Sequence, residues 1–148
     1  LRRKRVTIEA NRELERGNIV RTYAGLIGRV IDAQGTRGTV MLLTDAESAV
    51  AARVQRQDGD LGMVYAAPEA TEDAVMLKMI PHSHNADLRM GDVVVSSGDG
   101  GVYPKGLPVG IIERVETSSV NVASITAYMR PFADFEHLDY VLVERRGE

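Results

Sequence analysis

Serine, histidine and acidic side chains are the residues of this chain that could form a nucleophilic active site. The histidines are His82, His84 and His137, and Ser96 and Ser97 stand just before a glycine-rich stretch. A nucleophilic serine needs a histidine as its base and a carboxylate that orients the histidine. None of the three histidines has such a setting in the sequence. Serine hydroxyls at the end of a strand usually bond nearby backbone, so we predict no catalytic residue.

The sequence around those serines does not match a known catalytic or phosphate-binding motif. The segment GDGG at residues 98–101 has glycines and an aspartate like those around the nucleophile of serine proteases, but the serine is missing from its middle. Lys105 and Gly106 reverse the order of the Gly-Lys ending of a phosphate-binding loop, and no helix is expected after them. We therefore predict neither proteolysis nor nucleotide binding.

Metal and sugar sites are also weakly supported. His82 and His84 could be two ligands on one strand face, but zinc needs a third and a fourth ligand, and the chain has no cysteine. Two exposed loop histidines are the simpler interpretation. Aromatic residues make up 5% of the chain, without tryptophan, which is too few for a sugar-binding groove. We predict no metal and no cofactor, and an interaction module rather than an enzyme.

Residues 98–108, here called the arch, are the strongest candidate for contact with another protein. The arch holds four glycines and two prolines between two runs of β-branched residues. Glycine adopts positive φ at little cost, and proline fixes φ near about −65°, so the backbone itself should shape this loop. We expect the arch to present Val102, Tyr103 and Lys105, because a stiff loop loses little entropy on binding. In the alternative, Tyr103 packs onto its own barrel and the arch merely closes one end.

Short apolar runs of period two predict that β-strands carry this loop. Turn residues separate the runs, and roughly a dozen short strands at such spacing are typical of sandwiches and barrels. Phe132, Phe135 and Leu138 have the spacing of one helical turn packed on the core. The predicted fold is all-β, with short helical turns only. The expected strands lie near residues 6–10, 25–32, 39–45, 50–55, 62–67, 75–80, 91–96, 109–116, 124–129 and 140–144.

The number of strands favours two small barrels over a single large one. Residues 25–85 look self-contained, so residues 5–24 and 86–148 should form the barrel that contains the arch. Residues 25–85 would then be a second, inserted barrel, and a serial split near residue 80 is the alternative. Residues 1–4 are expected to be a basic linker end. Both barrels should close, because an open edge strand exposes unpaired backbone groups.

The composition is that of an ordinary globular protein, with 148 residues, 44% hydrophobic and 26% charged. Residues 2–5 contribute +4 to a net charge of −3, so the rest of the chain carries −7. An acidic body argues against nucleic-acid binding. No apolar run reaches about 18 residues, so no membrane span is predicted. The start at Leu1 rather than Met predicts a fragment or a processed product.

Three patches of the sequence resemble the family of the bacterial rod shape-determining protein MreC. The first is GDVVVSSGDGGVYPKGLPVGIIERV at residues 91–115, similar to a strand that leads into a GGxxPKGLPVG loop. The second combines GLIGRV at residues 25–30 with VMLLTD at 40–45, and the third is PFADF at 131–135 with the apolar residues after it. The motif residues expected to shape the backbone are Gly25, Gly28, Gly91, Asp92, Gly98, Gly100, Gly101, Pro104, Gly106, Pro108 and Gly110.

The resemblance implies two small β-barrels of chymotrypsin-like topology that follow a membrane helix and a coiled coil outside these residues. It implies a non-catalytic scaffold of the cell-wall elongation machinery, in the periplasm or otherwise outside the cytoplasmic membrane. The implied partners are a class B penicillin-binding protein, which is a transpeptidase, MreD, MreB, other elongation-complex proteins and further copies of the chain, as a dimer or a filament. The alternatives are a degenerate protease-like or cell-wall hydrolase and a purely structural, self-assembling wall element.

Overall fold

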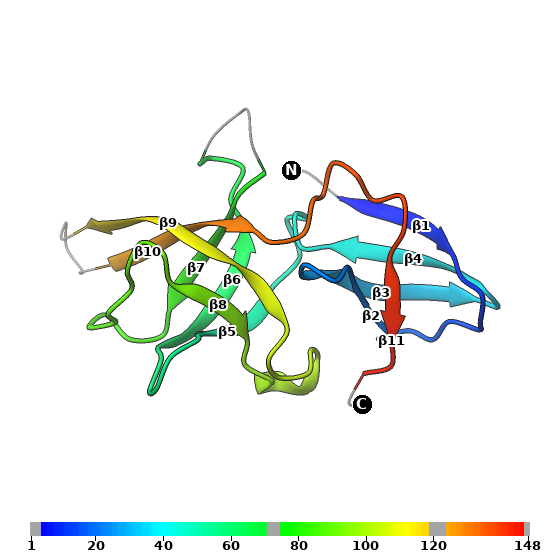
Figure 1. The fold of residues 1–148 in the computed structure, drawn as a ribbon, viewed down its shortest axis with the longest axis horizontal. Coiled ribbons are helices and arrows are strands. Elements are labelled where there is room, and N and C mark those ends of the chain that lie inside the picture. The colour runs from blue at the N-terminus through cyan, green and yellow to red at the C-terminus, as the bar shows by residue number, and fades with distance from the viewer. Residues whose placement is uncertain (1–3, 71–74, 119–123, 147–148) are drawn as a thin grey trace.

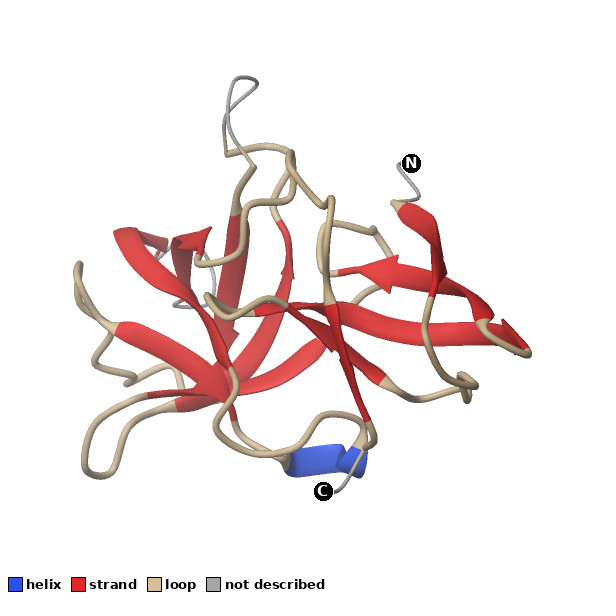
Figure 2. Cartoon of the chain, turned by 45° about the vertical axis from the view of Figure 1, so that its right-hand side comes forward, coloured by secondary structure: helices blue, strands red, loops and turns tan. Residues whose placement is uncertain are grey.

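Alternating apolar side chains form antiparallel strands in the structure, a computed structural model that describes residues 4–70, 75–118 and 124–146. In these ranges the regular structure is eleven strands and one short 3₁₀ turn (Figure 2). No helix of these ranges has the length and apolar character to cross a membrane. The elements are β1 (Arg5–Glu9), β2 (Ile19–Arg21), β3 (Leu26–Gln34), β4 (Arg37–Leu42), β5 (Val50–Val54), β6 (Leu61–Ala66), β7 (Leu77–Pro81), β8 (Val93–Ser96), η1 (Asp99–Gly101), β9 (Pro108–Ser118), β10 (Ser124–Pro131) and β11 (Leu142–Glu144).

The strands form two separate hydrogen-bonded sheets that lie side by side (Figure 1). One is a closed barrel in the order β10-β7-β6-β5-β8-β9, and the other is a five-stranded sheet in the order β1-β4-β3-β2-β11. All pairings in both are antiparallel. The all-β prediction is therefore confirmed, but only one of the two expected barrels is closed within the described ranges.

The expected division of the strands does not match the pairing. Strands β3 and β4, which were expected to pair with β5 to β7, pair with β1 and β2 instead. A domain boundary at residue 25 would cut the hairpin of β2 and β3. The turn of this hairpin is closed by a hydrogen bond from the Thr22 N–H to the Gly25 carbonyl (2.9 Å). The barrel is the continuous stretch from β5 to β10, inserted before β11, so neither the nested boundaries nor a split near residue 80 fits. The period of the apolar residues indicates where strands lie but not which strands pair with each other.

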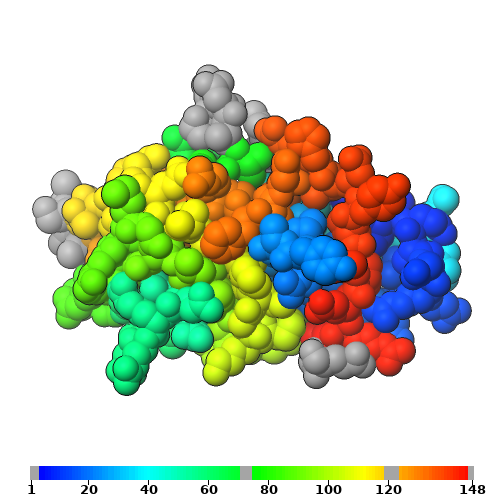
Figure 3. Space-filling view, viewed as in Figure 1, coloured from blue at the N-terminus to red at the C-terminus, as the bar shows by residue number. Residues whose placement is uncertain are grey.

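The buried apolar residues form two clusters, and the barrel cluster extends to Ile19 of β2 and Leu26 of β3 in the neighbouring sheet. The barrel interior holds Val50, Val64, Leu77, Met79, Val94, Val109, Ile112 and Met129, all almost fully buried. The five-stranded sheet encloses Val20, Ile27, Val30, Val40 and Leu42. Phe135 packs against both clusters, and the segment after β10 that carries it runs over the seam between barrel and sheet, orange in Figure 3.

That segment is not the helical turn expected from the spacing of Phe132, Phe135 and Leu138. The Asp134 carboxylate accepts the Glu136 N–H (3.0 Å), a side-chain bond that competes with helix formation. Phe135 and Leu138 still pack on the cores as expected, but from an irregular chain.

The connection between β4 and β5 is fixed by Asp45, whose side chain is fully buried. Its carboxylate accepts the N–H groups of Lys4 (2.7 Å) and Glu47 (2.8 Å). The Arg5 Nε lies 3.5 Å from the same carboxylate. Of the expected linker end, residues 1–3 lie outside the described residues, whereas Lys4 is already part of this structure. Asp45 thus ties the start of β1 to the chain that enters the barrel.

We expect Asp45→Ala to lower the free energy of unfolding by about 2–4 kcal/mol, because it leaves the part-buried N–H groups of Lys4 and Glu47 without their acceptor and removes the carboxylate beside Arg5 Nε. Urea denaturation of the purified chain measures the change. The control is Glu47→Ala, which removes an exposed partner of Arg5 and should cost at most about 1 kcal/mol. Equal losses in both variants would show that Asp45 has no special role.

Candidate interaction surface

The arch is closed at its base by Ser96, a buried residue at the end of β8. Its hydroxyl donates to the Pro104 carbonyl (2.6 Å) and accepts the Leu107 N–H (2.9 Å). Its backbone N–H donates to the Leu107 carbonyl (2.9 Å), and its own carbonyl accepts the Gly106 N–H (2.8 Å). The side chain and the backbone of one residue therefore join both arms of the loop, and the hydroxyl bonds nearby backbone as predicted for a strand end.

The backbone of the arch needs glycine at its two bends. Gly98 and Gly106 have φ of +85° and +91°, a left-handed conformation that other residues adopt at a cost. A Cβ on Gly98 would also lie 3.1 Å from the Lys105 Cβ, so the two arms touch there. Gly100 and Gly101 lie in η1. The glycines thus give the arch a defined shape, in line with the sequence-based expectation.

Of the three side chains expected to be presented, Val102 and Lys105 reach solvent and Tyr103 does not. Val102 is 37% exposed, whereas Tyr103 is 4% exposed and belongs to the barrel core. Burial raises the pKa of Tyr103 to about 12, and the nearby Arg29 guanidinium of β3 acts in the opposite direction. Its hydroxyl makes no hydrogen bond of normal geometry to any described residue. The alternative interpretation therefore describes Tyr103: it packs onto its own barrel.

The three sequence patches meet at the seam between barrel and sheet. A Cβ on Gly25, in the turn between β2 and β3, would lie 3.0 Å from the Pro108 carbonyl oxygen and 3.0 Å from the Phe132 Cβ. The Phe132 N–H also donates to the Val109 carbonyl (3.1 Å). The end of the arch, the β2–β3 turn and the segment after β10 are therefore in direct contact, and only glycine fits between them without displacing backbone.

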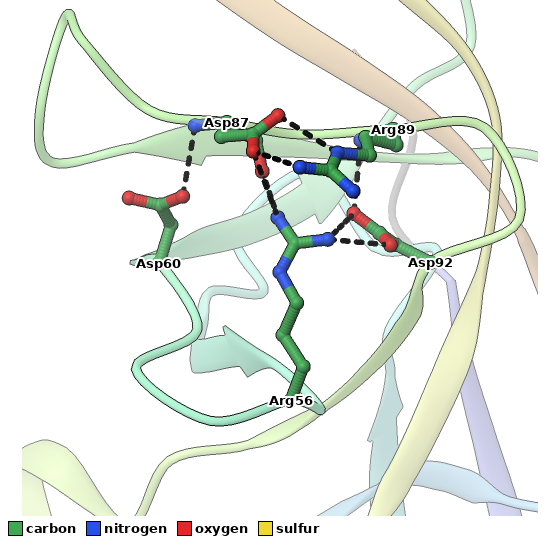
Figure 4. A network of polar contacts seen from close by, with 5 residues as sticks. All are labelled: Arg56, Asp60, Asp87, Arg89 and Asp92. Atoms are coloured by element: carbon green, nitrogen blue, oxygen red, sulfur yellow. Dashed lines mark hydrogen bonds and ion pairs between the residues drawn. The ribbon is translucent and has the colours of Figure 1, made fainter.

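Asp92 has a different role, in an ionic network at the opposite end of β8 (Figure 4). Arg56 Nη1 donates to both carboxylate oxygens of Asp92 (2.9 and 3.0 Å), and the Arg89 N–H donates to one of them (2.9 Å). Arg89 Nε also donates to Asp87 (3.0 Å), which lowers the pKa of that exposed carboxyl. The Asp87 N–H donates to Asp60 (2.9 Å). This network, which the sequence did not indicate, joins the β5–β6 turn to the loop before β8.

The remaining motif glycines lie within or beside strands. Gly28 in β3 stands opposite Leu42, and Gly110 in β9 stands opposite Pro131. The Gly91 N–H, just before β8, donates to the Ile112 carbonyl (2.8 Å). All three glycines thus lie in strand pairs or bond to a strand.

The side chains that could act in catalysis or bind a metal ion are not brought together. His82 and His84 are exposed after β7, and His137 Nδ1 lies 2.8 Å from Asp134 Oδ2, an exposed pair in which the pKa of the histidine is raised. The Ser97 hydroxyl lies 3.1 Å from Asp99 Oδ2 rather than beside an imidazole. Within the described ranges no three potential ligands cluster for a metal ion. What the site offers is a stiff loop with Val102 and Lys105 on its outside.

We expect Ser96→Ala to lower the free energy of unfolding by about 1–3 kcal/mol, because it leaves the buried Leu107 N–H and the Pro104 carbonyl without a partner. The matched control is the neighbouring Ser97→Ala, whose hydroxyl is exposed and whose loss should cost no more than about 0.5 kcal/mol. Chemical denaturation measures both. If the two variants are equally stable, the hydroxyl of Ser96 does not anchor the arch.

Known proteins are similar to this chain in sequence and in architecture. Residues 3–145 match the family described as rod shape-determining protein MreC, barrel core. The cell shape-determining protein MreC of Listeria monocytogenes is 36% identical over 130 residues, which cover 86% of this chain and 43% of that protein. A solved MreC structure from Listeria monocytogenes superposes with a TM-score of 0.79 at 26% identity, covering 99% of this chain and 78% of the other. The chain thus spans less than half the length of the curated relative.

Two solved structures of lower identity share the fold. One is the complex between penicillin-binding protein PBP2 and MreC from Helicobacter pylori, with a TM-score of 0.69, 19% identity, and coverage of 97% of this chain and 88% of that one. The other is described as the major periplasmic domain of the cell shape-determining filament MreC, with a TM-score of 0.73, 23% identity, and coverage of 98% and 94%. With the match over residues 3–145, the chain belongs to the rod shape-determining MreC family of non-catalytic cell-shape proteins.

Proposed function

We propose that this chain is a scaffold of the bacterial cell-wall elongation machinery that binds and positions peptidoglycan-synthesis proteins, foremost a class B penicillin-binding transpeptidase. The supporting observation is the family match over residues 3–145. A related MreC of the same fold has been solved in complex with PBP2. The proposed location is periplasmic or extracytoplasmic, since a second related structure is described as a periplasmic domain. Anchoring in the cytoplasmic membrane would use a helix outside these residues.

The arch is the proposed contact with the transpeptidase. Ser96 and the two glycine bends fix its backbone before any partner arrives, so binding would order few additional groups. Val102 supplies exposed apolar surface and Lys105 a positive charge at its outside. Tyr103 contributes indirectly, because its buried ring supports the loop that carries the other two side chains.

Further contacts in the elongation complex are part of the same proposal. MreD, MreB and other elongation proteins are the proposed additional partners, together with self-association as a dimer or a filament. We also propose that the five-stranded sheet is the counterpart of the second barrel in a chymotrypsin-like pair. Its curvature supports this, since β1 and β11, at opposite ends of the strand order, line one common groove.

Binding of the purified chain to the ectodomain of a class B penicillin-binding protein from the same bacterium tests the arch. We expect Val102→Asp and Lys105→Glu each to weaken binding by about tenfold or more, as for residues central to an interface. Biolayer interferometry measures the affinities. Tyr103→Ala is a poor probe, because it would empty part of the barrel core.

The control is Met90→Asp, which places the same charge on a residue that is 76% exposed at the far end of β8. This variant should bind within about twofold of the parent, as expected for a surface change outside an interface. If all variants fold and bind like the parent chain, the arch is not the docking site. If the parent chain itself does not bind the transpeptidase, the proposed scaffold function is wrong.

A further inference from the structure

The open sheet has its two edge strands on either side of one groove. The groove has a volume of about 590 Å³ and is lined by residues 8–12, at the end of β1, and residues 141–144, in and before β11. Figure 3 shows the red C-terminal segment lying against the dark blue N-terminal one. The Arg12 Nη2 crosses the groove and donates to the Val143 carbonyl (2.9 Å). Within the described ranges no strand pairing joins β1 to β11.

Backbone groups on both sides of the groove point into it. The Lys4 carbonyl accepts the N–H of Leu42, the last residue of β4 (3.0 Å). The Ala10 N–H donates to the carbonyl of Thr36, just before β4 (2.8 Å). In an antiparallel pair, alternate residues turn their N–H and C=O groups toward the same neighbour. The groups of Thr7 and Glu9 therefore point away from β4. Glu9 lines the groove, and Thr7 lies on the same outer edge of β1 just before it. On the other side, the Val143 carbonyl faces the groove, as its bond to Arg12 shows.

The direction of the two edges suits a single added strand. Four successive antiparallel pairings, from β1 through β4, β3 and β2 to β11, make β1 and β11 run parallel to each other. One strand placed between them would be antiparallel to both and could pair on each side. It would bring the sheet to six strands, the number in the neighbouring closed barrel.

The floor and rim of the groove define the chemistry of such a strand. Val6, Ile8, Val141 and Val143 are partly buried against the core of the sheet, so its apolar interior is incompletely covered at this point. An added strand would turn every second side chain toward that floor. The rim carries the carboxylates of Glu9 and Glu144, which already face Arg37 (3.2 Å) and Arg21 (3.9 Å), so the rim has no net negative charge to offer. The groove therefore favours an extended segment with apolar side chains at alternate positions.

We propose that the groove between β1 and β11 is a strand-addition site for an extended segment of a partner protein. The segment runs antiparallel to both edges, with apolar residues at alternate positions that cover the floor. Arg12 occupies the Val143 carbonyl until the added strand replaces it. This site is separate from the arch, and it does not depend on the proposed contact with a transpeptidase.

A capped peptide of sequence KVTVTVK, with apolar residues at alternate positions, is the probe, and KVVVTTK is its matched control of the same composition. Titration of the 148-residue chain with fluorescently labelled peptide should show saturable binding of the first and at least about tenfold weaker binding of the second, since only the first can cover the apolar floor. Amide hydrogen exchange of the unmutated chain should slow at Thr7 and Glu9 when the alternating peptide is bound.

Thr7→Pro removes an N–H on the outer edge of β1 that β4 does not use, so the proline is tolerated in this edge strand. It should weaken binding by about tenfold or more, whereas Thr7→Val should stay within about twofold because it keeps the backbone donor. Arg12→Ala should bind more tightly, because the guanidinium no longer competes for the Val143 carbonyl. Equal binding of both peptides, absence of saturable binding, or protection confined to other strands would overturn the proposal.

Discussion

The close contact at Gly25 is the constraint on which the arrangement of this molecule depends. Three segments far apart in the sequence meet there: the turn between β2 and β3, the end of the arch at Pro108, and Phe132 after β10. A side chain at Gly25 would have to displace a carbonyl or the chain beside it. The seam thus fixes the barrel against the sheet, and it also fixes the point at which the arch returns to β9. The position of the arch depends on that geometry.

A scaffold needs surfaces whose shape exists before binding, and this chain obtains them from backbone hydrogen bonds. Ser96 joins the two arms of the arch with four hydrogen bonds, two made by its backbone and two made by its hydroxyl with backbone groups. The ionic network around Asp92 fixes the other end of β8 through Arg56. Between these two ends, β8 is part of the closed barrel. The arch is therefore mounted on a strand that is held at both ends, which is why a short loop of glycines and prolines keeps one shape.

The positions of most strands and the anchoring role of a strand-end serine could be predicted from the sequence, because period-two patterns and hydroxyl chemistry are local. The strand β2 (Ile19–Arg21) was missed, because three residues are too few to show such a pattern. The pairing of the strands could not be predicted, since the apolar pattern of β3 would fit either sheet equally well. The inward orientation of Tyr103 was also out of reach, because it depends on the barrel interior and on Arg29 of the other sheet. The Asp92 network was missed for a similar reason. Arg56 and Asp92 are 36 residues apart, and each alone looks like an ordinary surface charge.

The central claim is that the arch has its final shape in the free chain. Amide hydrogen exchange of the unbound protein tests it directly at Gly106 and Leu107, whose N–H groups bond to Ser96. The account predicts that both amides exchange as slowly as that of Ile112 in the barrel strand β9, because all three open only with the barrel itself. Exchange at Gly106 and Leu107 near the rate of an unstructured peptide, with Ile112 still protected, would show that the arch is shaped by its partner and would contradict the account.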